Sequence, residues 1–374
     1  MAKEKEEKVV LTPEEQLRTY LKDNKEDHYN FAERVNWRIS TGSMALDIAT
    51  GGITPSLVRF CGHNNSGKTP QALEVMRNFL ATVPNSRGIF VIAEGRLSQE
   101  NQNRTGLKFV TSAEEWKDGT IFVFETNIYE TVIGLIKETV LNNPSEKRYC
   151  FCIDSLDGLI LKGDVQKSAE DSHKVAGPQL LTKKMLQSLS IGMFKYGHLL
   201  LLISQVTSEV KIDPYAKTAT RDGNFSGGNA VEHWADFVLE FQPAYQNDYI
   251  LDNPDGKVGD GKSKTLGNWC KVKMVKSTLE ASKRQVIKYP IKNGKKPSGV
   301  WIEYEIGDLL LQWEMARSKG AWVTIEDSLI KELSDNKLTI TKQHNGIKAL
   351  RSYLEENPEI TQYLYQKFKT LISQ

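Results

Sequence analysis

The chain has 374 residues, enough to bury a large core, and its 39% hydrophobic and 26% charged residues are typical of a globular protein. The formal net charge of +2 excludes a polycation that holds nucleic acid through an overall positive field, so nucleic acid would need a local groove. The first residues, MAKEKEEKVV, lack the apolar stretch of a secretory signal, and no apolar run has transmembrane length. We therefore expect a cytoplasmic protein without membrane contact.

Four cysteines lie in or beside apolar runs, at Cys61, Cys150, Cys152 and Cys270. Cys150 and Cys152 form a C-x-C pair with no second pair nearby, and this spacing does not favour a zinc site. We expect buried, reduced thiols.

The predicted elements begin with a helix, after which strands and helices alternate. Thr12 precedes Pro13 and two glutamates, which is typical of a helix start. Strand-length apolar runs follow at 57–62, 88–94, 120–126, 149–155 and 198–205. Amphipathic helical patterns lie between them at 68–82, 127–141 and 177–196. Continuous apolar strands that alternate with helices predict an α/β fold with a largely parallel central sheet.

The pattern changes after the last of these strands. Short strands without intervening helices are predicted at WADFVLEF, WCKVKMV, QVIKYPI and GVWIEYE, and they would extend the sheet antiparallel. Residues 245–268, rich in Gly, Asp, Asn and Lys, predict a surface hairpin or a mobile insertion. From 306 onward the pattern is mainly helical. We thus expect an N-terminal segment over 1–36, a core over 37–305 and a C-terminal lobe over 306–374.

Residues 62–69 read GHNNSGKT and match the pattern G-x-x-x-x-G-K-[ST]. The motif joins a predicted strand to a predicted helix, where backbone N–H groups and a helix N-terminus bind phosphate. The residues predicted to bind a nucleoside triphosphate are Gly62, His63, Asn64, Asn65, Ser66, Gly67, Lys68, Thr69 and Pro70.

Within this motif, Lys68 is expected to reach the β- and γ-phosphates and Thr69 to bind Mg²⁺. Pro70 is tolerated in the first turn of a helix, where its missing N–H has no intrahelical partner. It also restricts Thr69, because a residue before proline disfavours the helical region. This restriction can weaken metal binding and slow hydrolysis.

Three polar residues end other predicted strands. Asp154 is expected to hold Mg²⁺ together with Thr69, although an acid at this place also suits a helix cap. Glu94 is a candidate general base, and Gln205 is a candidate sensor of the γ-phosphate. The alternatives are that Glu94 is a surface acid and Gln205 an ordinary polar strand end.

Several segments, in this order, resemble the RecA family of recombinases. They are ISTGSMALDIATGG (39–52), GHNNSGKT (62–69), VIAEG (91–95), CIDS (152–155), DSH (171–173), LISQ (202–205), SGGNA (226–230), KVKMVKS (271–277) and the stretch 298–322. The resemblance spans residues 36–324, and its C-terminal part is similar to bacteriophage recombinases of the UvsX type. It implies a RecA-like P-loop ATPase core with an N-terminal helical segment and a small C-terminal helical lobe.

The resemblance also implies roles for single residues. Glu94 matches the catalytic glutamate, which acts with Lys68, and Gln205 matches the glutamine that couples ATP to DNA binding. Asp154 and Lys276 match further ATP contacts, and Lys276 would reach the ATP of a neighbouring subunit.

Segments 157–176 and 206–228 match the two DNA-binding loops of the family. The residues assigned to DNA are Lys162, Lys167, Lys211, Tyr215, Lys217, Arg221, Phe225, Gly227, Gly228 and Asn229. By composition alone, the second segment is more often an ordinary flexible loop. Its basic and aromatic residues nevertheless suit backbone tracking and base stacking on unpaired DNA.

The chain departs from the family pattern at three places. After Glu94 it reads GRLSQENQN, where bacterial members carry an acid and a tyrosine against adenine, so the family's base contact does not carry over to these residues. VEHW (231–234) replaces the basic and aromatic residues of the subunit contact. Thr278 stands where a second lysine follows the counterpart of Lys276.

Together these features predict an ATP- and Mg²⁺-dependent recombination protein. It would polymerise on single-stranded DNA as a helical filament and exchange strands with homologous duplex DNA. A single-strand-binding protein and a loading mediator are further expected partners. Two alternatives stay open, namely a ring-forming RecA-fold motor such as a helicase, and a non-hydrolysing, ATP-regulated DNA-binding filament protein.

Overall fold

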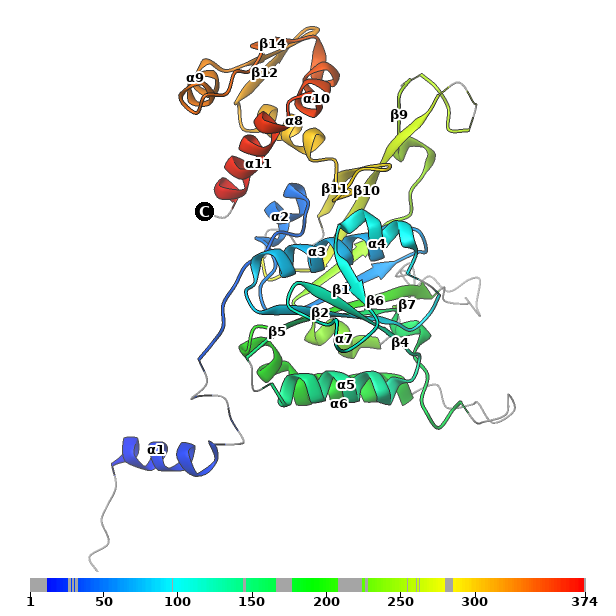
Figure 1. The fold of residues 1–374 in the computed structure, drawn as a ribbon, viewed down its shortest axis with the longest axis vertical. Helices are drawn as coiled ribbons and strands as arrows, with labels where there is room; N and C mark the ends of the chain where they lie inside the picture. Colours follow the sequence, from blue (N-terminus) through cyan, green and yellow to red (C-terminus); the bar gives the residue numbers. More distant parts are fainter. Residues whose placement is uncertain are drawn as a thin grey trace, which may run out of the picture.

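A long mixed sheet runs through the middle of the molecule (Figure 1). The computed structural model describes residues 12–25, 28, 30, 33–95, 97–143, 146–165, 177–207, 224–225, 228–253, 255–259, 261, 263–279 and 285–372. Among these residues the sheet has eleven strands. In spatial order, nine of them are β11 (Val286–Lys292), β10 (Thr265–Lys276), β8 (Phe237–Phe241), β1 (Leu57–Gly62), β6 (Leu199–Thr207), β5 (Arg148–Asp154), β2 (Ser86–Ile92), β4 (Thr120–Glu125) and β3 (Lys108–Val110).

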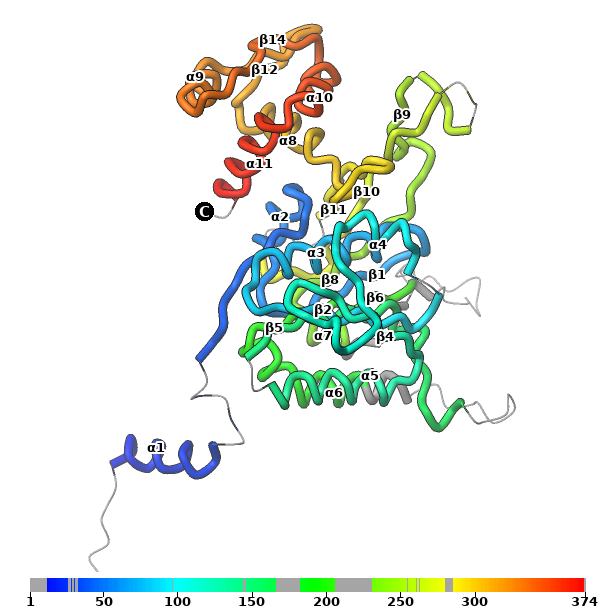
Figure 2. The backbone as a smooth tube through the Cα atoms, viewed as in Figure 1, coloured from blue at the N-terminus to red at the C-terminus, as the bar shows by residue number. Residues whose placement is uncertain are grey.

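Within this described order, the pairing of neighbouring strands changes from parallel to antiparallel at one place, between β8 and β10. From β8 to β3 all neighbouring strands are parallel, whereas β10 and β11 continue the sheet antiparallel. β7 (Asn224–Phe225) adds to β6, and β9 (Tyr249–Leu251) folds back on β10. The pairing of β9 with β10 confirms the surface hairpin predicted over 245–268, and Figure 2 shows it projecting beside the sheet.

Helices cover both faces of the sheet, as apolar parallel strands require. α2 (Met44–Thr50), α3 (Lys68–Thr82) and α4 (Gln99–Thr105) lie on one side, and α5 (Tyr129–Leu141), α6 (Gly177–Lys195) and α7 (Gly228–Trp234) lie on the other (Figure 1). Each face has its own apolar core, with Phe60 and Phe79 in the first and Phe151 and Leu189 in the second. This confirms the predicted α/β fold with a largely parallel sheet and antiparallel additions.

The predicted bounds of α3 and of the parallel strands, and the predicted state of the cysteines, are also confirmed. α3 has the predicted bounds, and the five predicted parallel strands are displaced by no more than two residues at either end. All four cysteines lie in the described part and are buried free thiols. Burial raises the pKa of Cys61 and Cys270 to about 12, so both thiols are protonated and inert.

The N-terminal helix stands apart from the sheet. α1 (Pro13–Asp23) starts at the N-cap Thr12, whose side chain and that of Glu15 form a reciprocal capping box. None of its eleven residues, all of them described, is buried, and Leu17 and Tyr20 are 60% and 65% exposed. Among the described residues, none buries the apolar side chains of this capped helix.

The C-terminal part builds a third core. It contains α8 (Ile302–Gln312), β12 (Ala316–Lys319), β13 (Trp322–Ile325), α9 (Asp327–Asp335), β14 (Gln343–His344), α10 (Gly346–Glu356) and α11 (Pro358–Ile372). Leu310, Leu333, Leu354 and Phe368 pack together there, and Met44 of α2 joins them. Among the described residues, no helix combines the length and apolar character needed to cross a membrane.

Two predictions for this region are wrong. The predicted strand GVWIEYE is instead the start of α8, and only Val300 forms an isolated bridge, with Ile291. The apolar residues Ile306, Leu309 and Leu310 recur at helical spacing and bury one face of α8, which outweighs the β-favouring side chains before them. The stretch after α8 was expected to be helical, but β12 and β13 form a hairpin around Gly320, whose φ is +60°.

Candidate nucleotide-binding site

The predicted site residues come together because of the strand order. β1, β6, β5 and β2 are adjacent and parallel, so their carboxyl ends lie at one edge of the sheet. The register pairs Gly62 with Gln205 and Ile92 with Asp154. Ligands of open α/β sheets bind at this edge.

The phosphate loop follows β1 and needs glycine at its two ends. Gly62 has φ +144°, and a Cβ there would lie 2.2 Å from the carbonyl oxygen of Phe241. Gly67 has φ +99° and is the N-cap of α3. Asn65 also has positive φ, and the Ser66 hydroxyl donates to the carbonyl of His63 at 2.7 Å, which closes the loop. The loop thus has the backbone geometry of a phosphate-binding turn.

Lys68 lies over this loop. Its ammonium donates to the carbonyl oxygens of Gly62 and His63 at 2.9 and 2.6 Å. Burial lowers the pKa of Lys68, and the nearby Asp154 carboxylate acts in the opposite direction. A phosphate in the cleft would add negative charge next to this buried cation and favour its charged form.

Thr69 and Asp154 form the second polar pair. The Thr69 hydroxyl donates to Asp154 Oδ2 at 2.7 Å, although Pro70 follows directly. Pro70 is the third residue of α3, and the first helical bond, from Gln71 N to Gly67 O, forms at 3.1 Å. Pro70 therefore leaves the Thr69 hydroxyl within reach of the carboxylate.

This pair fits Mg²⁺. Both side chains offer hard oxygen atoms, and burial raises the pKa of Asp154 although the Thr69 hydroxyl and the Lys68 ammonium act in the opposite direction. No cluster of three or more His, Cys, Asp or Glu side chains suited to a metal occurs in the described part of the chain. Mg²⁺ commonly takes only one or two protein carboxylates and completes its shell with phosphate and water.

Glu94 and Gln205 meet at the same edge. Gln205 Nε2 and the Ser155 hydroxyl each donate to Glu94 Oε1 at 2.5 Å. Glu94 follows β2 by two residues, Ser155 follows β5, and Gln205 lies near the end of β6. The candidate base and the candidate sensor are thus in direct contact, and Ser155 was missed by the sequence reasoning although it directly follows Asp154.

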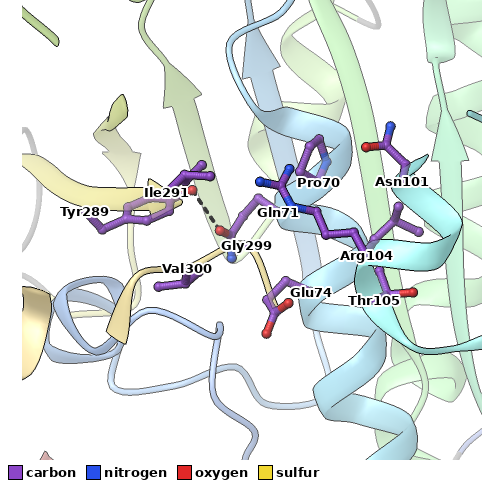
Figure 3. Close-up of a pocket in the computed structure, with 11 residues that line it drawn as sticks. Pro70, Gln71, Glu74, Asn101, Arg104, Thr105, Tyr289, Ile291, Gly299 and Val300 are labelled. Atoms are coloured by element: carbon purple, nitrogen blue, oxygen red, sulfur yellow. Dashed lines mark hydrogen bonds between the residues drawn. The ribbon is translucent and has the colours of Figure 1, made fainter. Parts of the chain in front are cut away.

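A cleft of about 770 Å³ is lined by residues 64–70 and by Glu94, Asp154, Ser155 and Gln205, whereas Gly62 and His63 are not part of its lining. Its lining extends past the phosphate loop to residues that no motif indicated, among them Asn101, Arg104, Gln242, Asn268, Trp269 and Asn293. Figure 3 shows the smaller pocket next to it, where Pro70, Asn101 and Arg104 also line the wall and Tyr289 donates to Gln71 at 2.7 Å. Trp269 lies on β10 and Asn293 directly follows β11, and the pairing of these antiparallel strands with the rest of the sheet brings both residues to the cleft.

Lys276 lies elsewhere. It pairs with Val238 of β8, level with the first half of β1, and its ammonium donates to the carbonyls of Glu232 and His233 at 3.0 and 2.8 Å. Lys276 therefore caps the end of α7 and is not among the described residues that line the cleft.

Most of the residues assigned to DNA lie outside the described residues, namely Lys167, Lys211, Tyr215, Lys217, Arg221 and Gly227. Of the others, Lys162 is exposed, Phe225 belongs to β7, and Gly228 and Asn229 open α7. Their assignment stays a prediction.

Comparison with known proteins agrees with this geometry. No family model matches the chain. Protein RecA of Petrotoga mobilis (strain DSM 10674 / SJ95) is 25% identical over 334 residues, which are 87% of this chain and 77% of that protein. Protein RecA of Dichelobacter nodosus (strain VCS1703A) is 24% identical over 88% of this chain and 81% of its own length. Protein RecA of Legionella pneumophila (strain Corby) is 23% identical, with coverage of 89% and 82%. Over most of its length, the chain is a distant relative of the RecA proteins.

Proposed function

We propose that this protein is an ATP-dependent recombinase that polymerises on single-stranded DNA and catalyses homologous pairing and strand exchange. The observation that carries the proposal is that one cleft holds the phosphate loop, the Thr69–Asp154 pair and the Glu94–Gln205 pair. The distant relationship to RecA proteins supports the same function.

ATP is the proposed substrate of the cleft. The loop N–H groups and Lys68 bind its phosphates, and Glu94 takes the proton of the attacking water. Thr69 and Asp154 hold Mg²⁺, which would neutralise phosphate charge when bound. Gln205 contacts Glu94, so a change at the γ-phosphate is passed to the segment after β6.

In the proposed filament, the N-terminal segment (residues 1–36) of one subunit contacts the core (residues 37–305) of the next subunit. The exposed face of α1, with Leu17 and Tyr20, docks on the core of the next subunit. Such a contact between different surfaces does not close on itself and generates a helical polymer. The Lys276 ammonium gives up its hydrogen bonds to the Glu232 and His233 carbonyls and instead contacts the ATP of the neighbouring subunit.

DNA binds to the segments 157–176 and 206–228 of successive subunits. Their basic and aromatic residues follow the phosphate backbone and stack on unpaired bases. Because pairing with the incoming duplex reads the sequence, a sequence-specific contact from the protein is not needed. A single-strand-binding protein and a loading mediator act before the filament forms.

The test measures ATP turnover with and without single-stranded DNA, together with strand exchange and electron microscopy in a slowly hydrolysed ATP analogue. We expect DNA-stimulated turnover, nucleotide-dependent filaments and exchange of homologous strands. Processive unwinding without exchange would identify the ring-forming motor, and filaments without turnover would identify the non-hydrolysing alternative. A protein that binds neither ATP nor single-stranded DNA would refute the proposal.

A further inference from the structure

A charged side chain is buried within the central sheet. Arg59 is only 1% exposed and is the third residue of β1. Leu57 and Cys61, which share its face of the strand, belong to the apolar core beneath α5 and α6. Burying a guanidinium in such surroundings is costly unless it is paired, so its partners indicate why it is there.

Arg59 has one hydrogen-bonded partner on β6, and carboxylates on two further elements act on its charge. Arg59 Nε donates to the Ser204 hydroxyl of β6 at 3.0 Å. Burial lowers the pKa of Arg59, and the carboxylates of Glu232 on α7 and Asp157 in the short helix Leu156–Gly158 act against this shift. The guanidinium thus lies between β6, α7 and the segment that follows β5.

Two of these groups lead to the nucleotide cleft: Ser204 directly precedes Gln205 in β6, and Asp157 is hydrogen-bonded to two residues of the cleft. Asp157 Oδ2 accepts hydrogen bonds from Gln205 N at 2.8 Å and from the Ser155 hydroxyl at 3.4 Å. Gln205 and Ser155 are the two residues that donate to Glu94. Asp157 is therefore linked to the proposed catalytic carboxylate of Glu94 through one intervening residue, which is Gln205 on one route and Ser155 on the other.

The third group leads away from the cleft. Glu232 lies on α7, which begins at Gly228, directly after the segment proposed to bind DNA. Lys276 donates to the Glu232 carbonyl and so fixes the end of α7 to β10. A shift of α7 would therefore move the Glu232 carboxylate, whose charge acts on Arg59.

We propose that Arg59 is a positioning residue, which links α7 to Gln205 and Glu94 through Ser204, Asp157 and Glu232. When the DNA segment moves α7, the buried guanidinium passes this movement to the groups around Glu94. The inference rests on the proposed ATPase function and adds to it the internal path between DNA binding and hydrolysis. A purely structural role, in which Arg59 only holds α7 on the sheet, is the competing explanation.

The test compares Arg59→Met, Arg59→Lys and, as a matched control, Arg87→Met. Arg87 pairs with Asp118 at 2.9 Å at the start of β2, the end of the strand opposite to Glu94. We expect Arg59→Met to lower DNA-stimulated kcat about tenfold or more while KM for ATP changes by less than about twofold. Arg59→Lys retains the charge and recovers part of kcat, and Arg87→Met stays close to wild type.

Hydrogen exchange provides a readout that does not depend on turnover. Binding of a slowly hydrolysed ATP analogue should slow amide exchange in both the phosphate loop and α7 of the wild type. In Arg59→Met the phosphate loop should still respond while the response of α7 is lost. If Arg59→Met does not fold, Asp157→Asn, which removes the charge but keeps the size, takes its place and should give the same pattern.

The two proposals fail in different ways. Wild-type protein whose phosphate loop does not respond to nucleotide contradicts the proposed function. A loop that responds while α7 does not, or an α7 response that is equal in Arg59→Met and wild type, overturns the role of Arg59. Wild-type kcat in Arg59→Met with a lowered melting temperature identifies the structural role and likewise overturns it.

Discussion

At the scale of single residues, Lys68 gives the most direct test of the cleft. Replacing it by Ala removes the buried cation that lies over the loop carbonyls and leaves the phosphates without their charged donor. We expect binding of an ATP analogue, measured by calorimetry, to weaken about a hundredfold. Lys331→Ala on the exposed side of α9 is the control and should bind like the wild type. Unchanged binding or turnover in Lys68→Ala would refute the site.

Gly62 tests the backbone of the loop independently of activity. In Gly62→Ala the new Cβ meets the Phe241 carbonyl at a φ that favours glycine, so we expect the free energy of unfolding to fall by about 2 kcal/mol or more. Gly134 lies within α5 with open space around its Cβ position. Gly134→Ala should therefore raise the free energy of unfolding by about 0.5–1 kcal/mol. Denaturant titration of both variants measures these opposite signs, and equal effects would contradict the geometry.

The site residues that the sequence predicted are marked by their neighbours along the chain. The residues that it missed are defined by contacts between segments that are far apart in the sequence. Residues 62–70 form a local motif, and Glu94 and Asp154 end apolar strands, so their place could be read from the order of residues alone. Arg59, Asp157 and Trp269 have no such local mark. Their roles depend on which strands are neighbours and in what register, and this pairing is set by the whole sheet.

At the scale of elements, α2 depends on a distant carboxylate. Glu305 of α8 accepts hydrogen bonds from the Ser43 hydroxyl at 2.5 Å and from the backbone N–H groups of Met44 and Ala45 at 3.1 and 3.2 Å. These N–H groups belong to the first turn of α2 and have no intrahelical partner. The sequence pattern of α8 predicted a strand here, so this contact was not foreseen.

Glu305 makes stability depend on pH. Burial raises its pKa from the ordinary 4.5 to about 7, so the folded state binds the proton more tightly than the unfolded state. The resulting stabilisation is present below pH 4.5 and is lost as pH rises through about 7, a change of about 3 kcal/mol. Between about pH 5 and about pH 8, the free energy of unfolding should fall more steeply in the wild type than in Glu305→Gln.

Chemical denaturation at several pH values checks this prediction. Burial also raises the pKa of the neighbouring Asp47, but Asp47 is present in both proteins and cancels in the comparison. Equal slopes in wild type and Glu305→Gln would show that Glu305 is ionised throughout this range.

At the scale of the whole molecule, changes in α1 should affect assembly without affecting folding. Because Leu17 and Tyr20 are exposed, the double change Leu17→Glu and Tyr20→Glu should leave the melting temperature within about 2 °C of the wild type. The same change places charges in the proposed contact with the next subunit and should abolish filaments seen by electron microscopy. Filaments of normal length would contradict the role of α1, and a large loss of melting temperature would show that it packs on its own subunit.

The contact between Ser43 and Glu305 spans 262 residues. A nascent chain on the ribosome therefore exposes the start of α2 without its acceptor until translation has passed residue 305. Met44 likewise can pack only after the apolar side chains of the C-terminal core have been synthesised. The part of the chain made first thus completes its own structure only when nearly all of the protein has been synthesised, which makes truncated translation products candidates for rapid proteolysis.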